Sequence, residues 1–368
     1  MSSLFSPIQL GHLQLNNRVA MAPMTRARIQ NAQDAADENT AIYYQQRASA
    51  GLLTTEGSPI SRQGQGFLYI PGIYNRQHVH GWQQTTKAVH EKGGKIFIQL
   101  WHVGRMSHTS LQPEGQSPVS SVDTQANGTC FAFDENGEAG RVAVSSARGL
   151  TVAEIKDVIA DYVKAAKYAI DAGFDGVEIH AANGYLIEQF INAGINTRSD
   201  SYGAQTIDNR LRFALEVTDA VCNAIGSDRT GIRISPFGRF SDMPAFDDEE
   251  LTWTTLGQEL ATRNLAYVHL NNQDVPDGST TLPDGFVEKF RAAYKGVLMI
   301  AGGFDKSSAE RYLSTGMVDM VAFGRPYIGN PDLVERMANG WPLNESIREF
   351  FYGGDNRGYI DYPYYQQK

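Results

Sequence analysis

Three side chains able to bind an oxygen atom or transfer a proton lie close together in the segment 176–185, G-V-E-I-H-A-A-N-G-Y. The apolar residues at its start predict a short buried strand, with His180 at its end and Asn183 and Tyr185 on the turn that follows. His180 and Asn183 could donate hydrogen bonds to one oxygen, such as a carbonyl that becomes an enolate, and Tyr185 could donate a proton. A single histidine at a strand end is usually structural, but this grouping of three polar residues favours an active site.

Eight strand candidates alternate with helical segments along the chain, which is the pattern of an α/β fold of the (β/α)8 TIM barrel type. The strands are expected at 18–23, 51–57, 95–101, 176–180, 230–235, 266–270, 297–301 and 318–323. Helices are expected between them at 39–49, 78–90, 151–173, 207–225, 248–264, 285–294 and 307–315, with a last helix at 330–339. An open doubly wound sheet is the alternative, but neither G-x-G-x-x-G nor G-x-x-x-x-G-K-[ST] is present. The barrel is therefore preferred.

Two segments fall outside the alternation. Residues 5–17 alternate apolar and polar around Gly11, which predicts a small N-terminal hairpin. Residues 104–148, after the third strand, are rich in Ser, Gly, Asn and Pro, and neither flank resembles a linker. We therefore interpret 104–148 as an insertion in one domain that spans residues 1–368.

In such a barrel the carboxyl ends of the strands build the active site, and phosphate usually binds at the loops after strands seven and eight. Gly302-Gly303 and Gly324-Arg325 occupy these two positions. Glycines let backbone N–H groups approach phosphate oxygens, and a guanidinium adds charged donors. These glycines could equally form tight turns without a ligand, but their coincidence at both expected positions favours a phosphate site.

Polar residues at other strand ends suit a flat ligand with a polar edge. Arg233 interrupts an apolar strand, so its charge either points to the barrel mouth or has a buried partner. Gln99 could satisfy backbone groups or bind the N–H and C=O edge of a ring, and Thr25 could cap a helix or donate to a ligand. Together with a phosphate tail, these residues fit flavin mononucleotide (FMN), a cofactor that needs no dinucleotide fingerprint.

Composition excludes several other classes of protein. The net charge of −9 gives no broad electrostatic footprint for nucleic acid. Cys130 and Cys222 are the only cysteines, which excludes a disulfide scaffold or a cysteine-held iron–sulfur cluster and suits a cytoplasmic protein. We expect no membrane partner, because the sequence shows neither a signal peptide nor an apolar run long enough to span a bilayer. We expect no metal site, because the eight histidines are scattered and H-E-x-x-H is absent.

Segments spread in collinear order over nearly the whole chain resemble the Old Yellow Enzyme family. Within it they are similar to the bacterial alkene reductases of the N-ethylmaleimide, morphinone and pentaerythritol tetranitrate reductase type. The segments are P-M-T-R (23–26), Gln99 with Trp101, H-A-A-N-G-Y (180–185), R-S-D-S-Y-G (198–203), I-S-P-F-G (234–238), A-G-G-F (301–304), F-G-R-P (323–326) and F-Y-G-G with D-Y-P (351–363). The motif of strand four and the F-G-R-P turn are the most specific of these.

The resemblance implies an FMN-containing barrel that takes hydride from NADPH or NADH. The reduced flavin N5 would pass hydride to Cβ of an activated alkene, such as an enone, a maleimide or, in some members, a nitro compound. By motif position, the residues implied to contact FMN are Pro23, Met24, Thr25, Gly57, Gln99, Arg233, Gly302, Gly303, Gly324 and Arg325. Those implied to bind substrate are His180, Asn183, Trp101, Phe240 and Tyr352, with His180 and Asn183 gripping its carbonyl and Tyr185 protonating Cα.

The resemblance also covers the two segments outside the alternation, because 104–148 matches the family's capping segment and the hairpin its barrel plug. The enzyme would act on small molecules, without nucleic acid or membrane, as a monomer or homodimer. One departure is Ala204, which follows Tyr202-Gly203 where the family commonly has a second glycine. Some relatives have His in place of Asn183.

Two other functions stay open at this point. A flavin-free barrel lyase or isomerase could use the same phosphate site on a sugar phosphate. It is weakened by the lack of a lysine at the strand ends other than Lys95, which starts a strand. The second is a non-catalytic flavin-binding protein.

Overall fold

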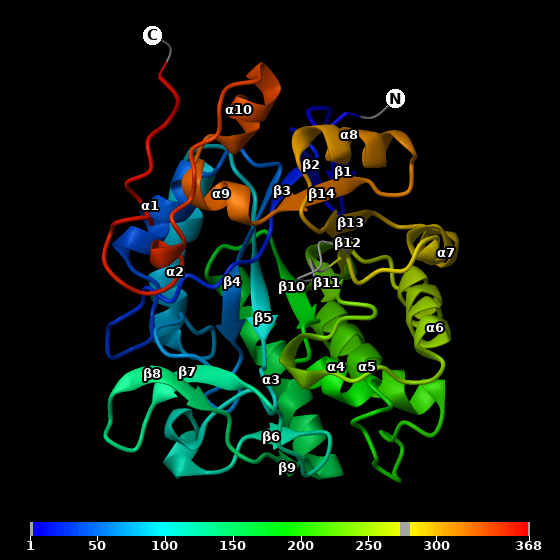
Figure 1. Cartoon of the computed structure of the whole chain (residues 1–368). Helices are drawn as coiled ribbons and strands as arrows, with labels where there is room; N and C mark the ends of the chain where they lie inside the picture. Colours follow the sequence, from blue (N-terminus) through cyan, green and yellow to red (C-terminus); the bar gives the residue numbers. More distant parts are fainter. Residues whose placement is uncertain (1–2, 273–279, 367–368) are drawn as a thin grey trace.

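The computed structural model describes residues 3–272 and 280–366. Eight parallel strands close into a barrel, surrounded by helices (Figure 1). In chain order these strands are β3 (Val19–Met21), β4 (Leu52–Pro59), β5 (Ile96–Trp101), β10 (Gly176–Ala181), β11 (Thr230–Ile234), β12 (Tyr267–Asn271), β13 (Leu298–Ala301) and β14 (Met320–Phe323). The last strand, β14, pairs with the first, β3. The expected (β/α)8 TIM barrel is confirmed.

The helices follow the strands in the expected alternation. They are α1 (Glu38–Gln46), α2 (Arg76–Glu91), α3 (Val152–Asp171), α4 (Leu186–Ile191), α5 (Ile207–Ile225), α6 (Glu249–Ala261), α7 (Phe286–Ala293), α8 (Lys306–Ser314), α9 (Arg325–Gly329) and α10 (Leu333–Asn339). Thr151 and Glu154 form a capping box that starts α3, as the T-V-A-E sequence indicates. Asp37 caps α1, so Thr25 is not the cap of that helix. The five-residue α9 is too short to show a helical period, and the sequence did not predict it.

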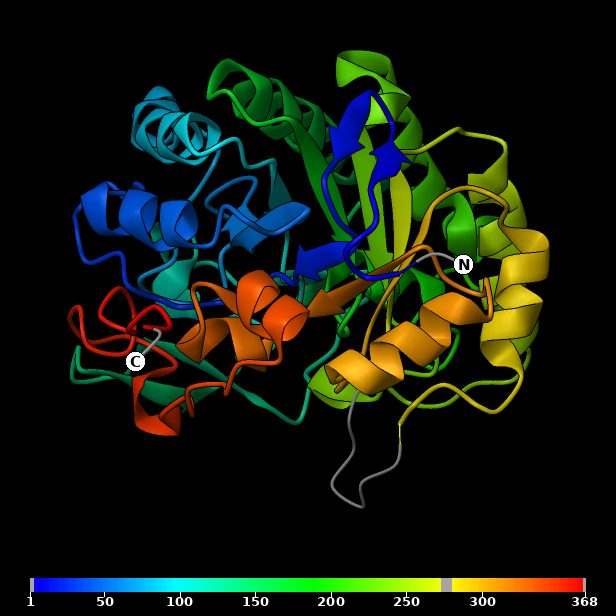
Figure 2. The ribbon, with the colours of Figure 1, turned by 90° about the horizontal axis from the view of Figure 1, so that it is seen from above.

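The N-terminal hairpin closes one end of the barrel (Figure 2). It consists of β1 (Ile8–Leu10) and β2 (Leu13–Leu15), paired antiparallel. Leu10, Leu13 and Leu15 are buried in one cluster with Phe97 and Met299 from the barrel strands. Burying each leucine contributes roughly 1.5–3 kcal/mol. The predicted hairpin plug is confirmed.

The insertion after β5 lies at the end of the molecule opposite the hairpin (Figure 1). It contains β6 (Val119–Ser120) and an antiparallel pair, β7 (Thr129–Phe133) and β8 (Ala139–Ala143). At its end, β9 (Arg148–Gly149) pairs with β6. Cys130, Ala132 and Val144 pack in one apolar cluster with Trp101, and Tyr185 packs against that cluster. The insertion therefore covers the strand ends that carry the predicted site.

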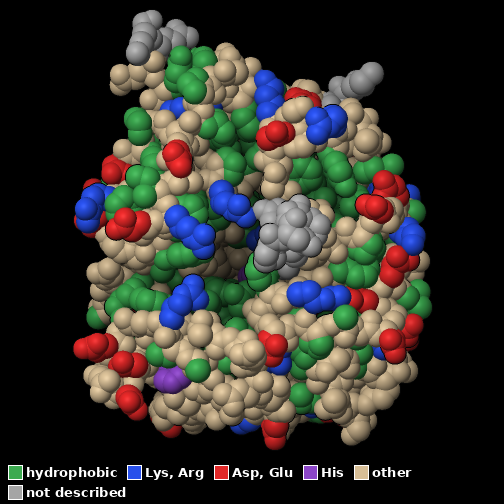
Figure 3. Space-filling view, in the orientation of Figure 1, with side chains coloured by type: hydrophobic (Ala, Val, Ile, Leu, Met, Phe, Trp, Pro, Cys, Tyr) green, Lys and Arg blue, Asp and Glu red, His purple; other side chains and the backbone are tan. Residues whose placement is uncertain are grey.

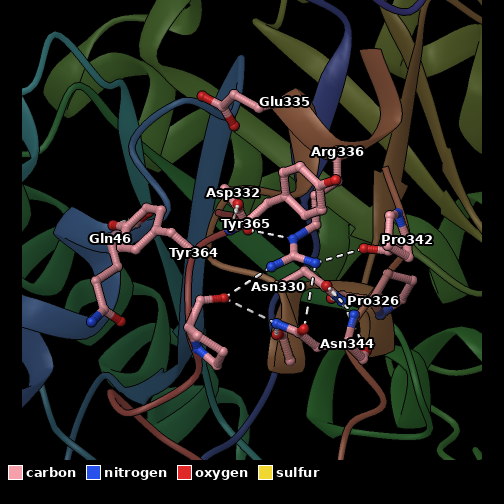
Figure 4. A network of polar contacts seen from close by, with 12 residues as sticks. Gln46, Pro326, Asn330, Asp332, Glu335, Arg336, Pro342, Asn344, Tyr364 and Tyr365 are labelled. Carbon is pink, nitrogen blue, oxygen red and sulfur yellow. Dashed lines mark hydrogen bonds and ion pairs between the residues drawn. The ribbon is translucent and has the colours of Figure 1, made fainter. Parts of the chain in front are cut away.

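A network of polar contacts around Arg336 anchors the C-terminal segment (Figure 4). Arg336 Nε pairs with Asp332 Oδ1 at 2.6 Å, and both side chains are buried. The guanidinium also donates to the carbonyls of Pro342 and Pro363 at 2.6 and 2.9 Å, and the Tyr365 N–H donates to Asp332 Oδ2 at 2.6 Å. These bonds hold the tail against α10.

A second guanidinium holds the same tail to the loop after β3. Arg26 is fully buried and donates to the carbonyls of Phe350, Phe351 and Gly358 at 3.2, 3.0 and 2.8 Å. In return, the Gly353 N–H donates to the Arg26 carbonyl at 2.9 Å. Tyr352 is thereby placed beside the first strand of the barrel.

Candidate active site

The carboxyl ends of the barrel strands surround a cavity of about 540 Å³, within the usual range for a small-molecule site. The face of the molecule drawn in Figure 1 is hollowed near its centre, with Lys and Arg side chains around the hollow (Figure 3). Of the predicted site residues, the cavity lining contains Pro23, Met24, Thr25, Arg233, Phe240, Gly302, Gly303, Gly324, Arg325 and Tyr352. The others lie on β4, β5, β10 and the turn after β10 and are Gly57, Gln99, Trp101, His180, Asn183 and Tyr185.

The rings of Trp101, His180 and Tyr185 pack against one another at the carboxyl ends of β5 and β10. The ring centroids of Trp101 and Tyr185 are 4.9 Å apart, and those of His180 and Tyr185 are 5.1 Å apart, both edge to face. Trp101 and His180 are stacked with centroids 5.9 Å apart. The structure therefore brings the predicted carbonyl ligand His180 into contact with the predicted acid Tyr185.

The turn that carries Asn183 is held by side chains of neighbouring segments. Asn183 and Gly184 both have left-handed backbone, with φ of 61° and 75°, a conformation that asparagine tolerates and glycine adopts freely. The Asn183 N–H donates to Ser235 Oγ at 2.7 Å, and the Gly184 N–H donates to Glu188 Oε2 at 2.8 Å. Ser241 Oγ donates to the Asn183 carbonyl at 2.8 Å. These three bonds fix the backbone from which the Asn183 side chain projects.

His180 is a neutral hydrogen-bond donor. Burial, together with the nearby Arg233 charge, lowers the pKa of His180 to about 3. The backbone N–H of Ala182 lies 3.3 Å from Nδ1 of His180, so this nitrogen is the acceptor and the single ring proton is on Nε2. The ring can therefore donate to an oxygen without carrying a charge.

Tyr185 keeps its phenolic proton. Burial raises the pKa of Tyr185 above its ordinary value of 10, and the neighbouring Tyr352 raises it further. Tyr185 is consequently neutral over the physiological pH range and can serve as a proton donor.

Glu178 is a fully buried carboxylate two residues before His180 on β10. Gln99 Nε2 donates to its Oε1 at 2.8 Å, while Tyr267 Oη and His269 Nδ1 lie 3.0 and 2.9 Å from Oε2. Burial raises the pKa of Glu178, but His269 and Arg233 outweigh burial and leave the pKa below its ordinary value. Because an ionised carboxylate only accepts hydrogen bonds, the Gln99 amide must turn its NH2 toward Glu178 and its Oε1 away.

Arg233 combines the two roles that the sequence left open, because it has buried partners and also lines the cavity. Its charge lies close enough to Glu178 for each group to perturb the pKa of the other. One terminal nitrogen donates to Asn271 Oδ1 at 2.8 Å, and Asn271 Nδ2 donates to Asn183 Oδ1 at 2.8 Å. Among the described residues, the buried Nε of Arg233 has no hydrogen-bond partner.

Gly57 has a packing reason to be glycine. A Cβ at this position would lie 2.6 Å from Trp101 Cε3, inside the contact distance. The strand does not stop at Gly57 as expected, since β4 continues to Pro59 after an irregularity between Thr54 and Gly57. Beyond the irregularity, Gly57 pairs with Gln99 and Pro59 with Trp101.

The turns after β13 and β14 form the other end of the cavity. Gly302 and Gly303 follow β13, and a Cβ on Gly302 would lie 2.5 Å from the carbonyl oxygen of Asn272. Gly324 and Arg325 follow β14 at the start of α9. Backbone N–H groups, a guanidinium and little steric bulk thus meet where phosphate binds in this barrel type.

These groups together fit FMN. The cavity extends from the turn after β3 and from Arg233, whose buried Nε has no acceptor in the described part of the chain, to the two glycine-containing turns. A flavin has an edge of N–H and C=O groups for the first end and a phosphate for the second. The donor set therefore matches the cofactor implied by the resemblance.

Two polar residues of the site were not predicted from the sequence. Asn271 ends β12 and lines the cavity, but it follows an apolar run and resembles the first residue of a loop. Glu178 stands inside the apolar strand β10, as Arg233 stands inside β11. A charge in a buried strand was the available signal for Glu178. Phe351, next to Tyr352 on the tail, also lines the cavity.

The described part of the chain has neither a cluster of metal ligands nor a membrane-spanning helix. Residues 3–272 and 280–366 contain no group of three or more His, Cys, Asp or Glu side chains placed to hold a metal ion. Within the same ranges, no helix combines the length and apolar character needed to cross a bilayer. Cys130 and Cys222 are both free thiols.

Comparison with known proteins identifies the chain's relatives. Residues 3–344 match the NADH:flavin oxidoreductase / NADH oxidase family. Putative 12-oxophytodienoate reductase 5 of Oryza sativa subsp. japonica is 42% identical over 96% of this chain and 92% of its own length. The 12-oxophytodienoate reductase 1 of the same organism is 39% identical over 99% of this chain and 93% of its own length.

Solved structures give the same assignment. Morphinone reductase in complex with tetrahydroNAD superposes with a TM-score of 0.95, at 46% identity over 100% of this chain and 98% of that one. The Old Yellow Enzyme homologue from Zymomonas mobilis superposes with a TM-score of 0.92, at 38% identity over 98% of this chain and 99% of that one. The resemblance to Old Yellow Enzyme is confirmed, and the flavin-free and non-catalytic alternatives are set aside. The chain belongs to the NADH:flavin oxidoreductase / NADH oxidase family and is an FMN-dependent NAD(P)H oxidoreductase that reduces the C=C bond of activated alkenes.

Proposed function

We propose that the cavity binds FMN with its ring against the turn after β3 and its phosphate between the turns after β13 and β14. Pro23, Met24 and Thr25 would contact the ring, with Gln99 Oε1 and Arg233 at its polar edge and Gly57 close by. Gly302, Gly303, Gly324 and Arg325 would hold the phosphate. The single observation that carries this arrangement is the cavity itself, which joins the two glycine-containing turns to Arg233 and Thr25.

We further propose that His180 and Asn183 bind the carbonyl oxygen of the alkene. His180 is suited to this role because its Nε2–H is a donor on a neutral ring. A neutral N–H donor can stabilise the negative charge that develops on the carbonyl oxygen of the substrate during reduction. Trp101, Phe240 and Tyr352 would form the walls around the substrate, since the last two line the cavity and Trp101 packs against His180.

FMN, once reduced by NADPH or NADH, would supply the hydride for Cβ of the substrate. Tyr185 would then deliver a proton to Cα. Its ring contacts both His180 and Trp101, and burial keeps the hydroxyl protonated. A general acid of this kind typically contributes 10²–10⁴-fold to a rate. Enones and maleimides are the proposed substrates because each has a carbonyl conjugated to the C=C bond.

We propose NADPH and NADH as alternative reductants and the cytoplasm as the location. The chain would act as one FMN-binding domain, residues 1–368, in a monomer or homodimer, without nucleic acid or membrane partners. The free Cys130 and Cys222 thiols and the net charge of −9 support the location and the absence of a nucleic-acid partner.

Anaerobic stopped-flow absorbance tests the proposal. NADPH or NADH should bleach the flavin absorption, and 2-cyclohexenone or N-ethylmaleimide should restore it. The matched variant is His180→Ala/Asn183→Ala, which should be reoxidised by the enone at least a hundredfold more slowly, in keeping with the loss of oxyanion donors. Reoxidation of the double variant at the wild-type rate would overturn the assignment of the carbonyl ligands.

A further inference from the structure

Asn271 lies between the cofactor-facing Arg233 and the proposed substrate ligand Asn183. It is the last residue of β12, its side chain is 8% exposed, and it lines the cavity. It accepts a hydrogen bond from a terminal nitrogen of Arg233 and donates one to Asn183 Oδ1, both at 2.8 Å. The three side chains thus form a continuous chain of hydrogen bonds across two neighbouring strands and the turn after β10.

The donors and acceptors of the three side chains fix the direction of these hydrogen bonds. A guanidinium has donors and no acceptor, so Asn271 must turn its oxygen to Arg233. Its NH2 group then faces Asn183, which must turn its own oxygen to Asn271. The NH2 group of Asn183 is consequently on the side of the carboxamide away from Asn271.

The direction matters because the backbone of Asn183 is already fixed. Ser235 and Ser241 hold its N–H and C=O groups, at 2.7 and 2.8 Å, and φ is 61°. The side-chain carboxamide can still present either its oxygen or its NH2 group to Asn271. One choice presents a donor on the far side and the other presents an oxygen, which would repel a substrate oxygen that gains negative charge.

We propose that Asn271 is a positioning residue that sets the polarity of the Asn183 carboxamide, so that Asn183 presents N–H rather than C=O to the carbonyl of the substrate. Asn271 acts on the substrate through Asn183. The inference rests on the proposed role of Asn183 as a carbonyl ligand. It also makes Arg233 the origin of the hydrogen-bond direction at the substrate site.

The experiment is a double-mutant cycle read by ligand binding to the oxidised, FMN-loaded enzyme. The probe is 4-chlorophenol, whose phenolate oxygen resembles the oxygen of an enolate, and the readout is the change in flavin absorption on titration. Asn271→Asp keeps the shape of the side chain and still accepts from Arg233, but it can only accept from Asn183. Asn183 must then turn its NH2 group to Asp and its oxygen to the probe.

The Kd of 4-chlorophenol should rise about tenfold to a hundredfold in Asn271→Asp, as expected when a hydrogen bond to a charged group is lost. Asn271→Ala removes the hydrogen bond that orients Asn183 but does not favour the reversed orientation. The Kd of 4-chlorophenol should therefore rise less in this variant than in Asn271→Asp. The fold-rise in Kd caused by Asn271→Asp should be at least tenfold smaller in an Asn183→Ala background than in the native background. The same penalty in both backgrounds would overturn the proposal, because it would show that the new charge acts directly on the probe.

A failure of the Asn271 role can be distinguished from a failure of the proposed function. Retention of FMN by each variant shows that the barrel is folded. If Asn271→Asp loses the cofactor, Asn271→Ala replaces it in the double-mutant cycle. A wild-type enzyme that binds the probe but does not reduce 2-cyclohexenone would overturn the proposed function and leave the binding cycle intact. Normal enone reduction combined with equal penalties in the two backgrounds would overturn the role of Asn271 alone.

Discussion

Replacing His180 by alanine should slow the reduction of enones by roughly a hundredfold to a thousandfold. The wild-type ring presents Nε2–H as a donor, because Nδ1 accepts from the Ala182 N–H and burial lowers the pKa to about 3. Removing one donor to a developing oxyanion costs about 3 to 4 kcal/mol. Part of the loss in the alanine variant would come from Tyr185, whose ring would lose its edge contact with His180.

His180→Gln separates these two causes. The Gln side chain can place an N–H donor about as far from the backbone as the imidazole Nε2, and it fills much of the space beside Tyr185. We expect this variant to recover most of the rate and of the phenol affinity that alanine loses. A Gln variant as slow as the alanine variant would show that the imidazole is needed for something other than hydrogen-bond donation.

The pH dependence gives an independent check on the neutral ring. With a pKa of about 3, only about 1% of the His180 rings would be charged at pH 5. The rate of flavin reoxidation by 2-cyclohexenone, measured by anaerobic stopped flow, should therefore show no His180 titration between pH 5 and 8. An inflection near pH 6.5 that is present in the wild type and absent in His180→Gln would refute the reasoning.

Three other perturbations have defined outcomes. Tyr185→Phe should slow flavin reoxidation by enones 10²–10⁴-fold and spare flavin reduction by NADPH; equal losses in the two half-reactions, measured by stopped flow, would contradict a role as acid. Glu178→Gln should weaken FMN binding and lower stability, because it removes the buried negative charge that favours the charged form of Arg233; unchanged thermal unfolding and FMN affinity would contradict this coupling. Burial raises the pKa of Glu188 from 4.5 to about 8, so its stabilising contribution is complete below pH 4.5 and is lost as the pH rises through 8. Thermal unfolding between pH 5 and 9 should therefore show a steeper loss of stability for the wild type than for Glu188→Gln, and parallel curves would contradict it.

The barrel could be predicted from the sequence because its signals are local. Apolar runs of strand length, helix caps such as Thr151 with Glu154, and stops such as Lys92-Gly93-Gly94 each act within a few residues. The strand order then follows from the alternation alone. The sequence also predicts His180 at the end of the fourth strand and Arg233 within the fifth, and the register of β10 and β11 pairs these two residues.

Contacts between distant segments left no such signal. The function of Asn271 depends on Arg233 and Asn183, which only the closed barrel brings to it. Arg26 and Arg336 bind backbone carbonyls of the C-terminal tail, and a carbonyl has no side-chain identity to read in the sequence. The roles assigned to the site residues remain predictions, which the proposed kinetic and binding measurements test.

Because β14 pairs with β3, the cavity exists only once the barrel has closed. Its walls come from the turn after the first barrel strand, at Pro23–Thr25, and from the turns after the last two, at Gly302 and Gly324. Contacts of such high sequence separation form late and slowly in folding. FMN would therefore bind the closed barrel and not its open precursors, adding about 2.7 kcal/mol of apparent stability at a hundredfold excess over Kd. In a cell, bound flavin would then raise the share of the chain that stays in the closed form.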